Sequence, residues 1–237
     1  MYKRQSFAGV PRIYALLPGL GFTFVKPTTL KGRAITLVPL DAEAHGDDLF
    51  DQANGGDKDR VWTYLFDGPY ADRAVFKANL AQKQASNDPL FFAILDNTTG
   101  RAVGYQTFLR IEPVHRVIEV GNILYTPAMQ RTIGATEAQY LFARHVFEDL
   151  GYRRYEWKCN DLNAPSKRAA VRFGFTFEGV FRDHMIVKGR NRNTAWFSML
   201  ESEWPRRKAA FEAWLKPSNF RADGQQIESL ADLQSRA

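Results

Sequence analysis

The chain lacks several features that would assign it to a class at once. A single cysteine, Cys159, stands among 237 residues, which excludes an internal disulfide framework and suits a reducing compartment. No stretch approaches the roughly 18 to 20 apolar residues that cross a bilayer. The opening segment is broken by proline and glycine and has no small-residue cleavage pattern, so we interpret it as an arm rather than a signal peptide. We therefore expect a cytoplasmic protein with no membrane partner.

Metal-ligand patterns, internal repeats and low-complexity blocks are also missing from the sequence. The four histidines are scattered along the chain, so no metal site is expected. His145 falls on the apolar side of a predicted helix and is interpreted as a core residue. His115 and His184 are groove candidates with no motif around them.

The composition that remains is typical of a soluble globular protein, with 45% hydrophobic and 24% charged residues. A chain of this length buries most of its apolar surface without disulfides or metals. The formal net charge of +6 permits a partner that carries phosphate, either a small molecule or RNA. A basic but merely soluble surface explains the charge equally well, so charge alone does not identify a partner.

We divide the chain into three parts. Residues 1–26 form the N-terminal arm, residues 27–217 form one domain, and residues 218–237 form a polar C-terminal tail that we expect to be mobile. The length suits one sizeable domain with extensions at both ends.

Hydrophobic periodicity and turn residues predict a mixed order of strands and helices. The predicted strands are residues 33–40, 90–96, 102–111, 117–127, 152–159, 175–189 and 193–200, and the predicted helices are residues 41–54, 72–86, 135–151, 163–173 and 201–215. The strand–helix–strand unit in the middle makes two strands parallel, through a right-handed crossover. Short connections elsewhere favour antiparallel pairing. The fold class is therefore α/β (α+β), with a mixed sheet.

Ligands of such sheets gather beyond the carboxyl ends of the strands, where strand direction changes. That location falls on "ILYTPAMQRTIGATEAQY", where a strand ends and a long helix opens. Unpaired N–H groups at a helix start attract anions. Gln130, Arg131 and Thr132 add donors, and Gly134 with Ala135 permits close approach to the backbone. An ordinary strand-to-helix turn with a tolerated glycine is the structural alternative.

The stretch "NDLNAPSKRAAVRFGF" reads as a capped helix whose first turn is unusually polar. Asn163 suits the N-cap position, and Ser166 can satisfy a backbone group in the first turn. The same groups can face a ligand, because an open first turn offers donors in both directions. Lys167 and Arg168 either meet phosphates or are solvated.

These two stretches together resemble the GNAT superfamily of acyl-CoA-dependent N-acyltransferases, and within it the RimJ/RimL type. The specific part of the resemblance is an Asn-x-x-Ser…Gly-Phe-x-x-Glu-Gly-x-x-Arg pattern, present as Asn163, Ser166, Gly174, Phe175, Glu178, Gly179 and Arg182. The similarity runs from about Leu30 to Trp204. It implies a mostly antiparallel, twisted sheet flanked by helices, with a central parallel strand pair, and acetyl-CoA as co-substrate.

The resemblance also implies where acetyl-CoA would bind. The family's loop binds the coenzyme pyrophosphate through backbone N–H groups, and the matching positions are Gln130, Ile133 and Ala135. Ile133 stands where the family has glycine, although any non-proline residue still offers its N–H. By the same resemblance, Asn163 and Ser166 hydrogen-bond near the pantetheine arm and the thioester sulfur.

The catalytic expectations rest on the same likeness. Many family members carry a tyrosine seven residues after the asparagine, and Ala170 occupies that position, so Ser166 or water must protonate the leaving thiolate. The backbone of Ile123 and Tyr125 is expected to pair with pantetheine. Glu119 is our candidate general base, and the alternative is a solvated strand glutamate or one in an ion pair.

We therefore expect an acyl-CoA-dependent N-acyltransferase that acts on a protein N-terminus, an antibiotic-like amine or an amino-acid metabolite. The expected partners are an acyl-CoA and an amine acceptor, with a homodimer left open. Two other classes compete: an acyl-CoA-binding sensor or scaffold without turnover, and an RNA-binding accessory protein suggested by basicity alone. Four aromatic residues either line an acceptor groove or close the core: Trp62, Tyr64, Phe66 and Tyr70.

Overall fold

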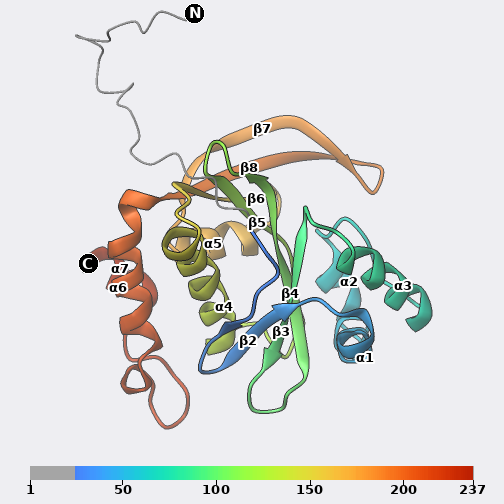
Figure 1. The fold of residues 1–237 in the computed structure, drawn as a ribbon, viewed down its shortest axis with the longest axis horizontal. Helices are drawn as coiled ribbons and strands as arrows, with labels where there is room; N and C mark the ends of the chain where they lie inside the picture. The colour runs from blue at the N-terminus through green and yellow to red at the C-terminus, as the bar shows by residue number, and fades with distance from the viewer. Residues whose placement is uncertain (1–24, 237) are drawn as a thin grey trace, which may run out of the picture.

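The computed structural model describes residues 25–236, which form an eight-stranded mixed sheet with helices on both faces (Figure 1). The predicted arm, residues 1–26, lies almost wholly outside the described residues. The spatial order of the strands is β1-β2-β3-β4-β5-β6-β8-β7. Every neighbouring pair is antiparallel except β5 and β6, which are parallel. The predicted fold class, with its one central parallel pair, is confirmed.

The strands lie close to the predicted ranges. They are β1 (Leu30–Lys31), β2 (Ile35–Pro39), β3 (Leu90–Asp96), β4 (Ala102–Glu112), β5 (Val117–Tyr125), β6 (Arg154–Asn160), β7 (Thr176–Val187) and β8 (Arg190–Leu200). The helices are α1 (Ala42–Ala53), α2 (Lys58–Trp62), α3 (Arg73–Gln84), α4 (Ile133–Arg144), α5 (Ala164–Arg172), α6 (Trp204–Leu215) and α7 (Leu230–Arg236). A π-helical turn (His145–Asp149) follows α4, and two 3-10 turns (Glu201–Glu203 and Pro217–Asn219) flank α6.

Short polar residues begin four of these helices. Asp41 accepts hydrogen bonds from two backbone N–H groups of α1, and Asp72 accepts one from α3. Thr132 and Asn163 do the same for α4 and α5. Such caps satisfy donors that the helix cannot pair internally, so local sequence alone sets these helix starts.

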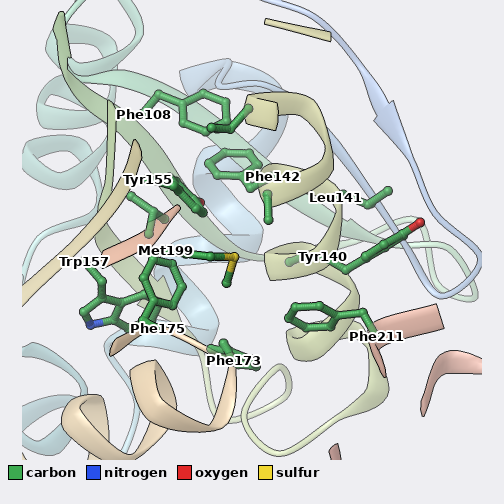
Figure 2. Close-up of a cluster of buried hydrophobic side chains, with 14 of the residues drawn as sticks. Phe108, Tyr140, Leu141, Phe142, Tyr155, Trp157, Phe173, Phe175, Met199 and Phe211 are labelled. Carbon is green, nitrogen blue, oxygen red and sulfur yellow. The ribbon is translucent and has the colours of Figure 1, made fainter. Parts of the chain in front are cut away.

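Two hydrophobic clusters hold the layers to the sheet. The α1 face of the sheet is covered by α1, α2 and α3, and the α4 face by α4, α5, α6 and α7 (Figure 1). On the α4 face, the rings of Phe108 and Phe142 stack with centroids 3.9 Å apart, in a cluster that includes Tyr155 and Phe211 (Figure 2). On the α1 face, Trp62 packs edge-on against Phe76.

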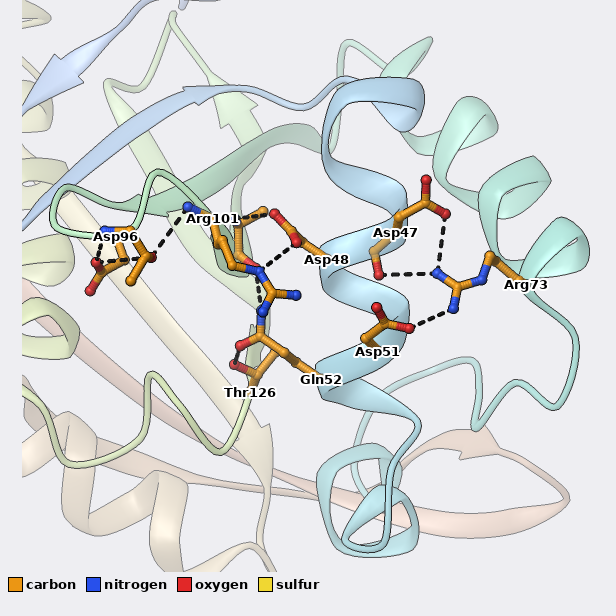
Figure 3. A network of polar contacts seen from close by, with 10 residues as sticks. Asp47, Asp48, Asp51, Gln52, Arg73, Asp96, Arg101 and Thr126 are labelled. Atoms are coloured by element: carbon orange, nitrogen blue, oxygen red, sulfur yellow. Dashed lines mark hydrogen bonds and ion pairs between the residues drawn. The ribbon is translucent and has the colours of Figure 1, made fainter.

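Polar contacts fix α1 to the sheet and to α3 (Figure 3). Asp48 pairs with Arg101 at 2.7 Å, at the start of β4. Gln52 donates to the backbone oxygen of Ala102 at 2.8 Å and accepts from Thr126 at 3.2 Å. Because Thr126 directly follows β5, these contacts also hold the start of the β5–α4 loop, which belongs to the candidate site.

The C-terminal residues differ from the prediction of a mobile tail. α7 packs against α6, and the side chain of Leu230 is fully buried. Arg206 donates to the backbone oxygen of Gln234 at 2.6 Å, which ties the two helices together. The sequence after Pro217 is polar on average, but its few apolar residues are spaced to dock on α6.

Candidate active site

A cleft of about 1360 Å³ opens where β5 and β6 separate. The two strands pair over four positions only, from Val117 opposite Arg154 to Val120 opposite Trp157. Beyond that point β5 turns away, because two of its residues, Asn122 and Ile123, stand opposite the single residue Gln106 of β4. This is a β-bulge, and Asn122 has a left-handed backbone with φ of 46°. The bulge therefore opens the sheet.

The cleft passes through the sheet and is lined from both faces. Side chains at paired positions share a face, so Glu119 lies on the same face as its partner Glu156. Lys158 likewise shares that face with Trp196 of β8. Trp157 belongs to the cluster under α4, so it lies on the opposite face. The α1 face thus supplies charged groups, and the α4 face supplies the first turns of α4 and α5.

The N-terminus of α4 lies at the cleft and carries two unpaired amides, of which Ile133 belongs to the lining. The Thr132 hydroxyl caps the N–H of Ala135 at 3.2 Å. Within residues 25–236, the N–H groups of Ile133 and Gly134 have no hydrogen-bond partner. Together with the helix dipole, they form an anion-binding end.

The residues of the β5–α4 loop that the sequence analysis named have different structural roles. The left-handed residue is Arg131, with φ of 64°, and Ile133 needs no such conformation, so its side chain is accommodated at the family's glycine position. Gly134 does not line the cleft. A Cβ there would come within 2.6 Å of Ile35, so this glycine serves packing against β2 instead of the close approach to a ligand that we expected.

Side chains at the end of β5 hold the loop in place. Gln130 donates to the backbone oxygen of Tyr125 at 2.8 Å and accepts from Arg60 of α2 at 2.8 Å. The Tyr125 hydroxyl donates to Gln106 at 2.7 Å and accepts from Gln139 at 2.8 Å. Burial raises the pKa of Tyr125, so its hydroxyl stays protonated.

At the start of α5, the cap and the cleft use the same residues. The Asn163 side-chain oxygen accepts from the N–H of Ser166 at 3.1 Å, as expected for an N-cap. The Ser166 oxygen accepts from the indole N–H of Trp157 at 3.0 Å, which leaves the hydroxyl hydrogen to donate elsewhere. Both residues line the cleft, and neighbouring Cys159 is a buried thiol whose pKa is raised by burial.

Glu119 lies on the α1 face between two cations and is only 5% exposed. One carboxylate oxygen, Oε2, lies 2.8 Å from Lys158 and 3.3 Å from Arg110. Burial raises the pKa of Glu119, and the charge of Lys158 opposes that shift. Lys158 also contacts Glu156 at 2.7 Å. The ion pair that we named as the alternative is present, and it leaves Oε1 without a hydrogen-bond partner among the described residues.

Residues 58–66, α2 with the loop after it, bridge the two sides of the cleft. The Tyr64 hydroxyl donates to the backbone oxygen of Leu162 at 3.0 Å, and Lys188 of the β7–β8 hairpin donates to that of Trp62 at 2.9 Å. Tyr64 and Phe66 line the cleft, whereas Trp62 and Tyr70 pack in the core. The aromatic set therefore divides between the two roles that we considered.

Sequence reasoning missed several residues that line the cleft. Arg192 comes from β8, and Trp214 and Phe220 come from α6 and the segment after it. No motif surrounds them, and their approach to the cleft depends on tertiary packing. His184, which had no pattern to support it, also lines the cleft and bonds to Thr194 at 3.0 Å.

In the part of the chain that the structure describes, no cluster of three or more potential metal-binding side chains occurs. None of the helices described is both long enough and apolar enough to cross a membrane.

Comparison with known proteins identifies the fold and the family. Residues 34–176 match the acetyltransferase (GNAT) domain family. A GCN5-related N-acetyltransferase from Brucella melitensis is 50% identical, with a TM-score of 0.88 over 89% of this chain and 96% of that one. A probable GNAT-family acetyltransferase from Chromobacterium violaceum is 38% identical, with a TM-score of 0.76 over 83% and 98% of the two chains.

A more distant structure shares the fold alone. The microcin C7 self-immunity acetyltransferase MccE, solved with acetyl-CoA and AMP, is 20% identical, with a TM-score of 0.62 over 71% of this chain and 93% of that one. No curated protein matches the chain. The matched domain covers more than half of the sequence, and the split sheet with its two open helix ends lies within it. The chain therefore belongs to the GNAT acetyltransferase family.

Proposed function

We propose that this protein is an N-acetyltransferase of the RimJ/RimL type, which transfers an acetyl group from acetyl-CoA to a primary amine. The observation that carries the proposal is the cleft that passes through the sheet beyond Val120. It gives two reactants access from opposite faces to the same stretch of β5. Much of the rate enhancement then comes from holding the two reactants together.

The α4 face suits the coenzyme. The free amide of Ile133, which lines the cleft, is placed to bind the pyrophosphate, with Arg131 and Arg168 as further cations at the same cleft. Asn163 and Ser166 lie where the pantetheine arm and the thioester would pass. The acetyl-CoA complex of MccE supports this choice of co-substrate for the fold.

The α1 face suits the amine. When bound, acetyl-CoA supplies a thioester that is open to attack by a neutral amine. Glu119, with a pKa raised by burial, takes the proton of the incoming ammonium through Oε1. Backbone N–H groups near Ile123 donate to the carbonyl oxygen. Ser166, whose oxygen accepts from Trp157, stabilises the departing thiolate with a hydrogen bond from its hydroxyl, and the thiolate takes its proton from water.

Calorimetric titration with CoA and acetyl-CoA tests the first half of the proposal. We expect micromolar affinity and a rise in Tm, because a ligand at 100 times its Kd stabilises the native state by about 2.7 kcal/mol. No thermal shift at millimolar acetyl-CoA would overturn the proposal.

Thiol release with a panel of amines, run with acetyl-CoA and succinyl-CoA, tests the second half. We expect release with acetyl-CoA and at least one amine. Binding without release for any amine would favour a sensor or scaffold, an alternative raised by Ala170 at the position of the family's tyrosine.

A further inference from the structure

Arg192 is a buried cation that points to the chemistry of the acceptor. Its side chain comes from β8, lines the cleft, and is only 8% exposed. Its Nε atom is buried without a hydrogen-bond partner. Within residues 25–236, no carboxylate lies within ion-pair distance of this guanidinium.

The register places Arg192 on the same face as Glu119. Thr194 pairs with Asn160 of β6, and Lys158 pairs with Trp196, so alternate residues of β8 face the charged side of the cleft. Arg192 follows this alternation, and its guanidinium lies 5.2 Å from the ring centroid of Phe66, which covers the α1 face. The coenzyme end of the cleft, at α4 and α5, lies on the opposite face.

The positive and negative charges on this side of the cleft are unequal in number. Ion pairs link three cations, Arg110, Lys158 and Arg154, to three carboxylates, Glu119, Glu156 and Glu178, and Arg192 lies on the same face without joining this network. If all of them are charged, four cations face three carboxylates, and Arg192 is the cation left without a partner. His184 does not correct the balance, since burial and the charges of Arg110 and Arg192 lower its pKa.

An unpaired buried cation is costly, so a ligand that neutralises it gains affinity. Burial lowers the pKa of Arg192, and the charge of Glu119, which is not in ion-pair contact with it, opposes that shift only in part. The Phe66 ring contacts the guanidinium and leaves its edge available for paired hydrogen bonds to a planar anion. A carboxylate has that shape, and its single negative charge matches the one unpaired positive charge.

We propose that Arg192 binds a carboxylate of the acceptor, so that the substrate is an amino carboxylic acid rather than an amine without an acidic group. The inference rests on the proposed function and deepens it, because it selects the amino-acid class among the amines left open above. It also makes Arg192 a specificity-determining residue on the face from which the amine enters.

The experiment compares acceptors that differ in one group. Thiol release is measured with α-, β- and γ-amino acids, with their carboxamides, and with ethanolamine and phosphoethanolamine. The wild-type enzyme is expected to prefer the free acids, with KM lower by about 10- to 100-fold, the range given by one hydrogen-bonded ion pair. A preference for carboxamides or for ethanolamine overturns the inference. A preference for phosphoethanolamine over every free acid overturns the choice of carboxylate.

Variants at two arginines of β8 assign the preference to a residue. Arg192→Met should abolish the preference for acids by raising their KM to that of the carboxamides, while the Kd for CoA, which binds on the other face, stays unchanged. Arg190→Gln is the matched control, because Arg190 is exposed on the same strand outside the cleft, and it should behave as wild type. Acid preference that survives in Arg192→Met overturns the role of this residue.

A stability measurement separates binding from structure. If Arg192 serves substrate, Arg192→Met removes an unpaired buried charge, and the Tm without ligand should be equal or higher. A lower Tm would mean that Arg192 is structural, and it would overturn the inference. Calorimetry of the same acids with CoA-loaded protein gives a readout that does not depend on turnover. If CoA itself fails to bind, the proposed function fails first, and the two failures are thereby distinguished.

Discussion

Glu119 lies between two cations, and this placement decides what its carboxylate can do. Lys158 and Arg110 both contact Oε2, so Oε1 is the atom left to accept a proton. Burial makes the charged form costly and raises the pKa of Glu119, while the charges of Lys158 and Arg110 oppose that shift. A carboxylate whose pKa is raised by burial accepts a proton more readily than an ordinary glutamate, which suits deprotonation of an ammonium.

Glu119→Gln should lower kcat by about 10²- to 10⁴-fold, the usual contribution of a general base. The affinity for CoA should stay nearly unchanged, because the glutamate lies on the face away from α4. Activity of the wild type should fall as pH drops through the raised pKa, since only the carboxylate accepts a proton. The pH profile of kcat/KM checks this.

In the Glu119→Gln variant that acidic limb should be absent, and the defect should shrink as pH rises and free amine accumulates. Glu112→Gln, an exposed glutamate on the neighbouring strand, serves as the control and should change neither profile. Full activity of Glu119→Gln at neutral pH would assign the glutamate to structure alone.

Asn163→Ala should impair catalysis more than folding. A lost N-cap costs about 1 kcal/mol, so the variant should remain folded while turnover falls well beyond that loss. Asp72→Ala is a matched control, because Asp72 caps α3 with a 2.9 Å bond and does not line the cleft. It should lose similar stability and keep its activity. Normal turnover in Asn163→Ala would mean that the asparagine serves only as a helix cap.

At the scale of elements, the sequence predicts those helix ends that are set by local capping residues. The cap at Asn163 and the stop at Gly174 are readable, and α5 begins and ends close to them, whereas the cap at Thr132 was not predicted. The bulge at Asn122 was not predicted, because its cause is a mismatch between two strands and not a turn residue. Arg192 was missed for a similar reason, since its environment comes from segments more than 100 residues apart, such as Phe66.

Residues 58–66 are joined across the cleft to the β7–β8 hairpin through Lys188 and to the loop before α5 through Tyr64. Tyr64→Phe and Lys188→Met each remove one hydrogen bond, worth about 0.5–1.5 kcal/mol. Each variant should therefore raise the KM of the acceptor by about two- to tenfold and leave the Kd of CoA unchanged. Steady-state kinetics at saturating acetyl-CoA measure this.

Lys58→Met should have no effect, because Lys58 is exposed on the same segment and its side chain makes no polar contact among the described residues. Equal weakening of CoA and acceptor would mean that the bridge supports the whole site and not the acceptor side.

At the scale of the whole molecule, alternation and periodicity are enough to predict the layers. Strands with apolar residues on both faces require helices on both sides, and the two clusters confirm that arrangement. The docked C-terminal segment was not predicted, because few apolar residues, such as Leu230, hold an otherwise polar sequence. That segment brings Phe220 to the cleft, so the site extends beyond the residues that match the family.

Phe142→Ala tests how strongly α4 is held to the sheet. Its ring is fully buried, stacks on Phe108 and lies 5.3 Å from Phe92, so removing it leaves a cavity. We expect the free energy of unfolding to fall by about 3–5 kcal/mol, measured by denaturant titration. Val75→Ala, at a position 58% exposed, should change it little. A loss below about 1 kcal/mol in Phe142→Ala would mean that the core relaxes around the gap.

The short pairing between β5 and β6 has a consequence for motion. Among residues 25–236, five strands lie on one side of this seam and three on the other, and the strand pairing that joins them consists of four residue pairs. Local opening of the sheet should therefore concentrate there, and amides near Val120 should exchange hydrogen for deuterium sooner than those between β3 and β4. A ligand bound in the cleft contacts both β5 and β6 and so holds the two sides of this seam together. Substrate binding should then reduce the relative motion of the two parts of the sheet, even at strands that do not contact the ligand.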